Sequence, residues 1–241
     1  MRLVVCLPTY NERDNLEPMV RRLAEVAEEH GLDMRVLVID DSSPDGTGEL
    51  ADRLAAELSF LSVLHRPEKE GLGPAYVAGF LWALATDAEL IAEMDCDFSH
   101  DPADLPRLLA AADRADVVLG SRYVAGGGTR NWGAGRRAVS RFGSLYARLL
   151  LGVGVRDLTG GFKVFRRSVL ETMGLERIST KGYAFQIETT YRAIRDGRRI
   201  VEIPIVFSER EAGGSKMSRG IVLEAFWKVP ELRLRALVGR L

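Results

Sequence analysis

Two aspartates separated by one residue, Asp95 and Asp97, directly follow an apolar run that ends at Met94. Alternation along an extended segment would place both carboxylates on one side of the chain, where they repel each other unless a cation lies nearby. Mg²⁺ and Mn²⁺ prefer carboxylate oxygens and commonly bridge to a diphosphate. The pair therefore predicts a divalent-metal site. Aspartates are also frequent in turns and helix caps, and Asp101 before Pro102 is predicted to be such a cap.

A second acidic pair, Asp40 and Asp41, follows another apolar run. A carboxylate after the second strand of a nucleotide-binding unit accepts hydrogen bonds from ribose hydroxyls or from a base edge, so Asp41 is a candidate nucleotide ligand. We predict that Ser43 and Pro44 are the N-cap and the first residue of the next helix. The sequence has no G-x-G-x-x-G after the first strand and no P-loop, which argues against a dehydrogenase or a P-loop kinase.

Acidic and basic side chains are segregated along the chain. Residues 1–116 hold 24 acidic and 10 basic residues, residues 117–156 hold seven arginines and no acid, and residues 157–241 hold 16 basic and 10 acidic residues. For the N-terminal acids outside the motifs, solvated helix faces are the simpler explanation. The arginine-rich segment suits an anion such as a phosphate. Its candidate ligands are Arg122, Arg130, Arg136, Arg137 and Arg141.

The elements that position these residues are short apolar runs alternating with amphipathic stretches. Runs that are apolar at every position fit parallel strands covered by helices on both faces. Ligands of such sheets bind beyond the carboxyl ends of the strands, which is where Pro8–Glu12, Asp40–Ser43 and Asp95–His100 lie. Five runs predict strands: Leu3–Leu7, Arg35–Ile39, Leu61–Leu64, Leu90–Met94 and Val117–Leu119.

Beyond Ser121 the alternation is less regular. Pro204 indicates a sheet edge or a bulge, and residues 209–219 predict a mobile loop because they contain two glycines and no apolar periodicity. We expect a catalytic domain over residues 1–219 and an amphipathic helical appendage over residues 220–241. The elements expected are a helix over Arg136–Leu151, a turn and short strand at Asp157–Phe162, a helix near Phe185–Arg195 and a strand pair over Ile200–Phe207.

No membrane-spanning or secretory segment is predicted. The richest apolar stretch, Leu145–Val155, is interrupted by Arg148, and the N-terminus enters an apolar run directly, so we expect a cytoplasmic protein. Both cysteines are predicted to be reduced packing residues, and His65 and His100 to be structural. Near the C-terminus, apolar residues recur at helical spacing among basic ones. Such a helix either packs on the domain or lies in a membrane interface. The apolar positions are Leu234, Leu237, Val238 and Leu241.

Seven segments, taken in order, resemble the motifs of family 2 glycosyltransferases, and most closely those of the polyprenol-phosphate (dolichol-phosphate) mannose synthases of actinobacteria. Together they span nearly the whole chain, and seven motifs in one order are much more specific than any one alone. The resemblance implies an α/β GT-A fold with a Rossmann-like, mostly parallel sheet. It also implies GDP-mannose as donor, a polyprenyl phosphate as acceptor, and Mg²⁺ or Mn²⁺. The segments are Pro8–Glu12, Asp40–Thr47, Gly71–Gly73, Asp95–His100, Gly120–Tyr123, Asp157–Phe162 and Gly214–Met217.

The same resemblance implies roles for individual residues. Ser99 stands where some members have a metal-binding glutamine, and Cys96 stands where alanine is commoner. The implied metal ligands are Asp95 and Asp97, and the implied catalytic residues are these two with Arg122 and Lys216. The implied nucleotide-sugar residues are Pro8, Tyr10, Glu12, Ile39, Asp41, Asp95, Cys96, Asp97, Arg122, Arg210 and Lys216. The acceptor phosphate is expected to meet Arg122, Arg136 and Arg137.

These residues predict an inverting mannosyltransferase that works as a peripheral protein at the inner face of the cell membrane. The acceptor phosphate, with a second pKa of about 6, is already ionised and needs no general base. Asp157 is equally compatible with a sugar-orienting or basic role and with a turn. Gln186 and Glu188 fit either sugar contacts or solvated positions. The alternatives are transfer from UDP-glucose or another UDP-hexose, and a non-catalytic nucleotide-sugar-binding subunit. A polytopic membrane partner is compatible with either, and no nucleic acid is expected.

Overall fold

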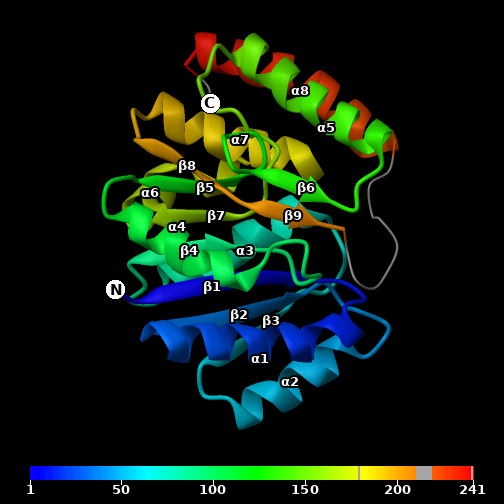
Figure 1. Ribbon diagram of the computed structural model, residues 1–241, viewed down its shortest axis with the longest axis vertical. Coiled ribbons are helices and arrows are strands. Elements are labelled where there is room, and N and C mark those ends of the chain that lie inside the picture. The colour runs from blue at the N-terminus through cyan, green and yellow to red at the C-terminus, as the bar shows by residue number, and fades with distance from the viewer. Residues whose placement is uncertain (179, 210–218, 240) are drawn as a thin grey trace.

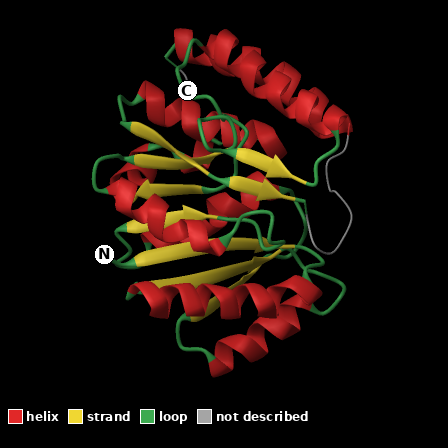
Figure 2. Cartoon of the chain, in the orientation of Figure 1, coloured by secondary structure: helices red, strands yellow, loops and turns green. Residues whose placement is uncertain are grey.

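The computed structural model describes residues 1–178, 180–209, 219–239 and 241. Within them, seven strands form a central sheet, with helices packed on both of its faces (Figures 1 and 2). Six of these strands run in the same direction, and β7 alone runs antiparallel to both of its neighbours. The strands, in sheet order, are β3 (Leu61–His65), β2 (Met34–Asp40), β1 (Leu3–Thr9), β4 (Leu90–Glu93), β7 (Lys163–Arg166), β5 (Val117–Ser121) and β8 (Ile200–Pro204).

Alternation along the strands divides the core between the two faces of the sheet. Val5 and Leu7 of β1 pack into one apolar cluster, whereas Val4 and Cys6 pack into the other. The first cluster is covered by α1 (Arg13–His30), α2 (Thr47–Glu57) and α4 (Leu105–Ala112). The second is covered by α3 (Leu72–Leu84), α6 (Arg167–Thr172) and α7 (Gly182–Arg195). The five predicted strands and the two-sided α/β arrangement are therefore confirmed.

The direction of β7 decides what gathers at one edge of the sheet. The parallel strands β1, β2, β4 and β5 all end at this edge, so the loops after them meet there. Because β7 is antiparallel to β4 and β5, it begins at the same edge. The residues that precede β7, from Asp157 to Phe162, are thus brought beside the loop after β5.

Two local predictions are wrong. Ser43 does not cap α2, which begins at Thr47 after Gly46 in a left-handed conformation; the Ser43 hydroxyl instead donates to Asp40 at 2.6 Å. The predicted strand pair over Ile200–Phe207 consists of two strands in different sheets. Pro204 is the last residue of β8, which is an edge strand of the main sheet. The prediction that Pro204 marks a sheet edge is therefore confirmed. The following strand, β9 (Val206–Ser208), pairs in parallel with β6 (Gly128–Arg130).

The last helix, α8 (Arg219–Leu237), packs against α7 and the arginine-rich helix α5 (Ala134–Leu151), as Figure 1 shows. Its buried face consists of Val229, Leu232 and Ala236. Of the apolar positions picked out by sequence spacing, Leu234 and Leu237 point elsewhere and are 64% and 66% exposed, whereas Leu241 packs against this cluster. Helix α8 thus packs on the domain and also presents apolar side chains to solvent. Among the described residues, none of the helices combines the length and apolarity needed to cross a bilayer.

The remaining elements are two short 3-10 helices, η1 (Pro102–Asp104) and η2 (Leu175–Arg177). As predicted, Asp101 caps η1, because its carboxylate accepts the backbone N–H of Ala103. The predicted mobile loop lies almost entirely in residues 210–218, outside the described residues. The division of the chain at residue 219 stays a prediction, although it coincides with the first residue of α8.

Candidate active site

The loop after β4 carries the predicted metal-binding pair. It forms a bend rather than the extended segment we expected, and Phe98 adopts a positive φ of 59°. Asp97 is buried, and its carboxylate accepts the backbone N–H of Ser99 at 3.0 Å. The Asp95 side chain is 28% exposed. The two carboxylates are therefore held by a turn, with Asp95 the more accessible of the two.

The buried side chain of His100 hydrogen-bonds the backbone of this loop. Its Nδ1 accepts the backbone N–H of Asp95 at 3.1 Å, and its ring packs 5.1 Å from the rings of both Phe162 and Phe207. Burial lowers the pKa of His100 to about 4, and nearby Arg122 acts in the same direction, so the imidazole is neutral at neutral pH. This confirms the structural role predicted for His100.

A divalent cation suits the donors that this loop offers. The described part of the chain contains no cluster of three or more His, Cys, Asp or Glu side chains that could enclose a metal. Mg²⁺, however, is commonly held by one or two carboxylates together with water and substrate phosphates. Asp95 and Asp97 would supply the carboxylates, whereas Cys96 is a buried thiol and a poor ligand for a hard cation. The residues thus fit a metal whose coordination is completed by a diphosphate.

The loops after β1 and β2 carry residues predicted to bind the nucleotide. Asp41 is 5% exposed, and its Oδ1 accepts Nη1 of Arg66 at 2.6 Å. Burial raises the pKa of Asp41 above its ordinary value, although Arg66 opposes the shift. Lys69 lies with its Nζ 3.8 Å from the ring centre of Tyr10. Arg66 and Lys69 were missed from the sequence, although both follow β3 at the ligand-binding edge of the sheet.

Other residues predicted to bind the nucleotide make contacts within the protein itself. The Glu12 carboxylate accepts Nδ2 of Asn15 at 2.7 Å, at the start of α1. Ile39 is fully buried in the core, so any contact it makes with a nucleotide must come from its backbone. Pro8, opposite Ile39 in the β1–β2 ladder, is half-buried. The Gly71–Gly73 motif is structural, because a side chain at Gly73 would meet the carbonyl oxygen of Thr180.

Arg122, directly after β5, forms a buried ion pair with Asp157. Its Nε and Nη2 donate to the two carboxylate oxygens at 2.7 and 2.6 Å, and Nη2 also donates to Thr159 at 2.8 Å. Burial alone would raise the pKa of Asp157, but the charge and hydrogen bonds of Arg122 hold it below its ordinary value. Of the two roles open for Asp157, this geometry favours the structural one, in which it anchors Arg122.

An aromatic cluster surrounds this arginine. The Arg122 Cζ lies 5.7 Å from the ring centre of Trp132 and 5.5 Å from that of Phe207. On α5, the Arg136 Cζ lies 4.2 Å from the same Trp132 ring, and its Nη1 pairs with Glu209 at 3.1 Å. The structure thus brings Arg122 and Arg136 to one tryptophan. Arg137 is exposed and has no ion pair within the described residues.

A buried network supports the sheet behind the site. Lys163 of β7 lies opposite Glu93 of β4, with its Nζ 2.9 Å from the Glu93 carboxylate, and it also hydrogen-bonds the Gln186 side chain. Burial raises the pKa of Glu93 to about 6. Glu188 pairs with Arg192 and is 1% exposed, and Gln186 is 2% exposed. The prediction of a solvated position is therefore wrong for both residues.

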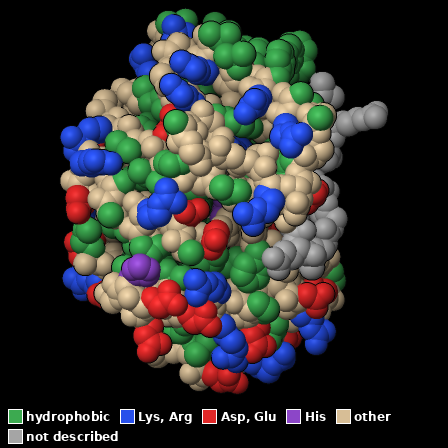
Figure 3. Space-filling view, in the orientation of Figure 1, with side chains coloured by type: hydrophobic (Ala, Val, Ile, Leu, Met, Phe, Trp, Pro, Cys, Tyr) green, Lys and Arg blue, Asp and Glu red, His purple; other side chains and the backbone are tan. Residues whose placement is uncertain are grey.

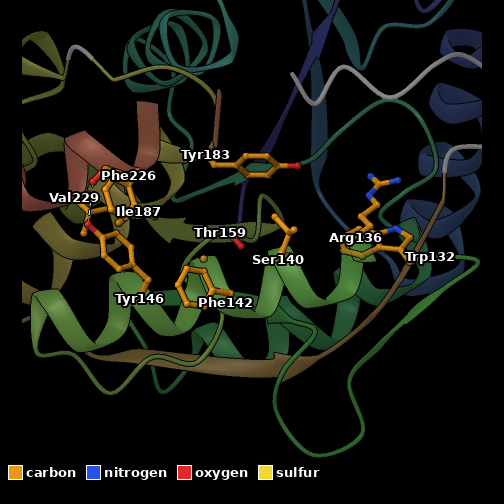
Figure 4. Close-up of a pocket in the computed structure, with 12 residues that line it drawn as sticks. Trp132, Arg136, Ser140, Phe142, Tyr146, Thr159, Tyr183, Ile187, Phe226 and Val229 are labelled. Carbon is orange, nitrogen blue, oxygen red and sulfur yellow. Dashed lines mark hydrogen bonds between the residues drawn. The ribbon is translucent and has the colours of Figure 1, made fainter. Parts of the chain in front are cut away.

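A cavity of about 120 Å³ lies between α5, α7 and α8 (Figure 4). Trp132 and Arg136 lie side by side at one end, and Tyr146, Phe226 and Val229 line the other. Sequence reasoning did not find this cavity, because its walls come from three helices separated along the chain. Arg210 and Lys216, the other predicted phosphate ligands, lie outside the described residues.

Apolar side chains are exposed on the outer surface of α5 and α8. Leu149 of α5 and Trp227 of α8 are 72% and 71% exposed, and Figure 3 shows apolar groups gathered over these helices among lysines and arginines. We call these residues the apolar face. It comprises Val139, Phe142, Leu145 and Leu149 of α5, with Phe226, Trp227, Leu234 and Leu237 of α8.

Comparison with known sequences identifies a protein family and similar relatives. The profile described as Glycosyl transferase family 2 matches residues 4–174. A polyprenol monophosphomannose synthase of Mycolicibacterium smegmatis is 48% identical over 241 residues, which cover 99% of this chain and 89% of the relative. An undecaprenyl-phosphate mannosyltransferase of Micrococcus luteus is 48% identical over 236 residues, which cover 98% of this chain and 96% of the relative.

Solved structures resemble this one at lower sequence identity. A Pyrobaculum calidifontis mannosyltransferase, solved in complex with GDP-Man and Mn²⁺, has a TM-score of 0.59 at 17% identity, covering 99% of this chain and 74% of that one. A Mycobacterium tuberculosis glucosyl-3-phosphoglycerate synthase, solved with Mn²⁺, UDP and phosphoglyceric acid, has a TM-score of 0.65 at 18% identity, covering 99% and 78%. At these identities the likeness concerns the fold alone.

Proposed function

Because the chain belongs to glycosyl transferase family 2 and has the GT-A type of fold, we propose that it transfers mannose from GDP-mannose to a polyprenyl phosphate. The two relatives at 48% identity are named for mannosyl transfer to such lipids. One observation carries the proposal: Phe207 packs on both His100 and Trp132, at 5.1 and 5.3 Å. It joins the acidic loop, which suits a metal and diphosphate, to the cationic end of the apolar cavity.

In the proposed reaction, an oxygen of the acceptor phosphate forms a bond to C1 of mannose. The bond between C1 and the diphosphate oxygen breaks, GDP leaves with the electron pair, and the configuration at C1 inverts. A cation held by Asp95 and Asp97 would supply positive charge to the leaving diphosphate. The acceptor phosphate is ionised at neutral pH, so no side chain has to remove a proton from it. This agrees with Asp157 being engaged by Arg122.

The acceptor is proposed to lie along the cavity. Arg122 and Arg136 would attract its phosphate, and the apolar lining between α5 and α8 would contact the first part of its hydrocarbon chain. The remaining chain is much too long for a cavity of about 120 Å³ and would stay in a membrane. The apolar face would then rest on that membrane, at the inner side of the cell.

Donor choice is tested by calorimetry with GDP-mannose, UDP-glucose and UDP-N-acetylglucosamine, each with Mg²⁺ or Mn²⁺. We expect GDP-mannose to bind at least about tenfold more tightly, because a carboxylate such as Asp41 can accept two N–H groups from guanine but only one from uracil. A preference for either UDP-sugar would contradict GDP-mannose as the donor. Radiolabelled sugar transfer to a lipid extract then separates an enzyme from a non-catalytic binding subunit, since the latter transfers nothing.

Membrane attachment is tested with charged substitutions on the apolar face. Leu149→Glu and Leu237→Glu are each expected to weaken binding to anionic vesicles at least about tenfold, because each withdraws an exposed leucine from the lipid. Both side chains are exposed, so thermal stability and GDP-mannose affinity should not change.

The matched control is Leu81→Glu, the same substitution at a 52% exposed leucine on α3, away from α5 and α8. Flotation of the purified protein with vesicles measures the effect. If Leu81→Glu weakens flotation as much as the other two changes, the apolar face is not the contact surface. If purified protein does not float at all, attachment requires another component, such as a polytopic partner protein.

A further inference from the structure

Two buried N–H groups at the cationic end of the cavity have no hydrogen-bond acceptor among the described residues. They are Nε1 of Trp132 and Nε of Arg136. The two side chains are in contact, with the Arg136 Cζ 4.2 Å from the Trp132 ring centre, and Trp132 is 5% exposed. A buried donor without an acceptor destabilises the fold. Two such donors side by side in a cavity wall therefore indicate a ligand that brings oxygen atoms.

The surroundings favour an anionic ligand. Arg122 lies on the Trp132 ring, and α5 begins at Ala134, where Gly133 provides no side-chain cap for the free N–H groups of the first turn. The buried carboxylate beside Arg122, that of Asp157, is already paired with this arginine. The exposed anion at this position is Glu209, which pairs with Nη1 of Arg136 and leaves its Nε unbonded.

We propose that Nε1 of Trp132 donates a hydrogen bond to an oxygen of a phosphate monoester that Arg136 attracts, and that Glu209 competes with this phosphate for Arg136. The proposal rests on the proposed function, because it assigns Trp132 to binding the phosphate of the lipid acceptor. A donor diphosphate has the same oxygen chemistry. The acceptor is the better fit, because the cavity continues from Trp132 into an apolar lining formed by Tyr146, Phe226 and Val229 (Figure 4).

Trp132→Phe tests the hydrogen bond while keeping an aromatic ring against Phe207 and both arginines. We expect kcat/KM for polyprenyl phosphate to fall about 10- to 100-fold, because the variant loses one hydrogen bond to a charged group. The dissociation constant of GDP-mannose should not change. The substitution removes no hydrogen bond of the unliganded protein, because the N–H of Trp132 has no acceptor among the described residues. Loss of this N–H should therefore not lower the thermal stability.

Glu209→Gln tests the competition and should act in the opposite direction. It keeps the size of the side chain and removes its charge, so we expect KM for polyprenyl phosphate to fall several-fold. Glu209 is 48% exposed, so this variant should fold even if Trp132→Phe does not. An unchanged or higher KM in Glu209→Gln would overturn the competition with the acceptor phosphate.

Direct binding separates this inference from the proposed reaction. Geranyl phosphate, a short soluble monoester, should bind the wild-type protein in calorimetry and bind Trp132→Phe at least about tenfold more weakly, whereas geraniol should bind neither detectably. Equal binding of geranyl phosphate by both proteins would overturn the role of Trp132. A matching loss of GDP-mannose affinity in Trp132→Phe would assign the hydrogen bond to the donor instead. Failure of mannosyl transfer with intact geranyl phosphate binding would contradict only the proposed reaction.

Discussion

Replacing Asp97 by asparagine is expected to reduce mannosyl transfer at least about 1,000-fold while the protein stays folded. Asp97 is buried beside Asp95 in the bend after β4 and accepts the backbone N–H of Ser99. Asparagine keeps the size of the side chain and an oxygen for that hydrogen bond, but it removes one of the two carboxylate charges that this loop offers to a cation. Charge neutralisation on the leaving diphosphate should therefore be lost, whereas the loop should keep its shape.

The matched control is Asp101→Asn, four residues further along the chain. Asp101 is exposed and caps η1 through Ala103, so its loss should affect stability slightly and transfer hardly at all. Initial rates with Mg²⁺ or Mn²⁺, together with thermal unfolding, measure both variants. Undiminished turnover of Asp97→Asn, or full wild-type activity in excess EDTA, would show that no metal is held at this position.

Breaking the ion pair between Arg122 and Asp157 is expected to affect both stability and transfer. Arg122→Ala leaves the buried Asp157 carboxylate without its partner, and Asp157→Asn leaves the buried guanidinium without its own. Each change should lower the free energy of unfolding by about 3–5 kcal/mol. Transfer should fall as well, because Arg122 lies at the junction of the acidic loop and the cavity, with its Cζ 5.5 Å from the ring centre of Phe207. Urea unfolding and single-turnover transfer measure the two effects.

A double variant separates the structural role of the pair from its functional role. Arg122→Met combined with Asp157→Leu removes both charges, so most of the lost stability should return. Transfer should not return, because methionine offers no charge to a phosphate. If the double variant recovers both stability and transfer, Arg122 serves the fold alone.

The same pair predicts a pH dependence of stability. Arg122 holds the pKa of Asp157 below its value in the unfolded chain, so ionisation of Asp157 stabilises the folded state. This contribution is fully present above the unfolded pKa of about 4 and is lost as the pH falls through the lower folded value. The unfolding free energy of wild type minus that of the double variant should therefore be constant above about pH 5 and decrease in more acidic solution, because only wild type loses this contribution.

The sequence by itself determined the strands and the chemistry of the loops that follow them. Apolar runs such as Leu3–Leu7 specify buried strands, and the carboxyl ends of such strands lie at one edge of the sheet because the strands are parallel. Asp41, Asp95 and Asp97 were therefore predicted to share one edge of the sheet, where the structure has them. The order of the motifs was enough to identify the family that the profile match then confirmed.

Only the tertiary structure decided how distant segments meet. The antiparallel insertion of β7 between β4 and β5 brings Asp157 to Arg122, and no pattern within either segment shows that pairing. Helix α8 buries a different face from the one that its apolar spacing suggested, because α5 and α7 supply the surface it packs on. The cavity and the unpaired N–H of Trp132 arise in the same way. Periodicity and capping act between near neighbours in the chain, whereas these features depend on packing between elements that are far apart in it.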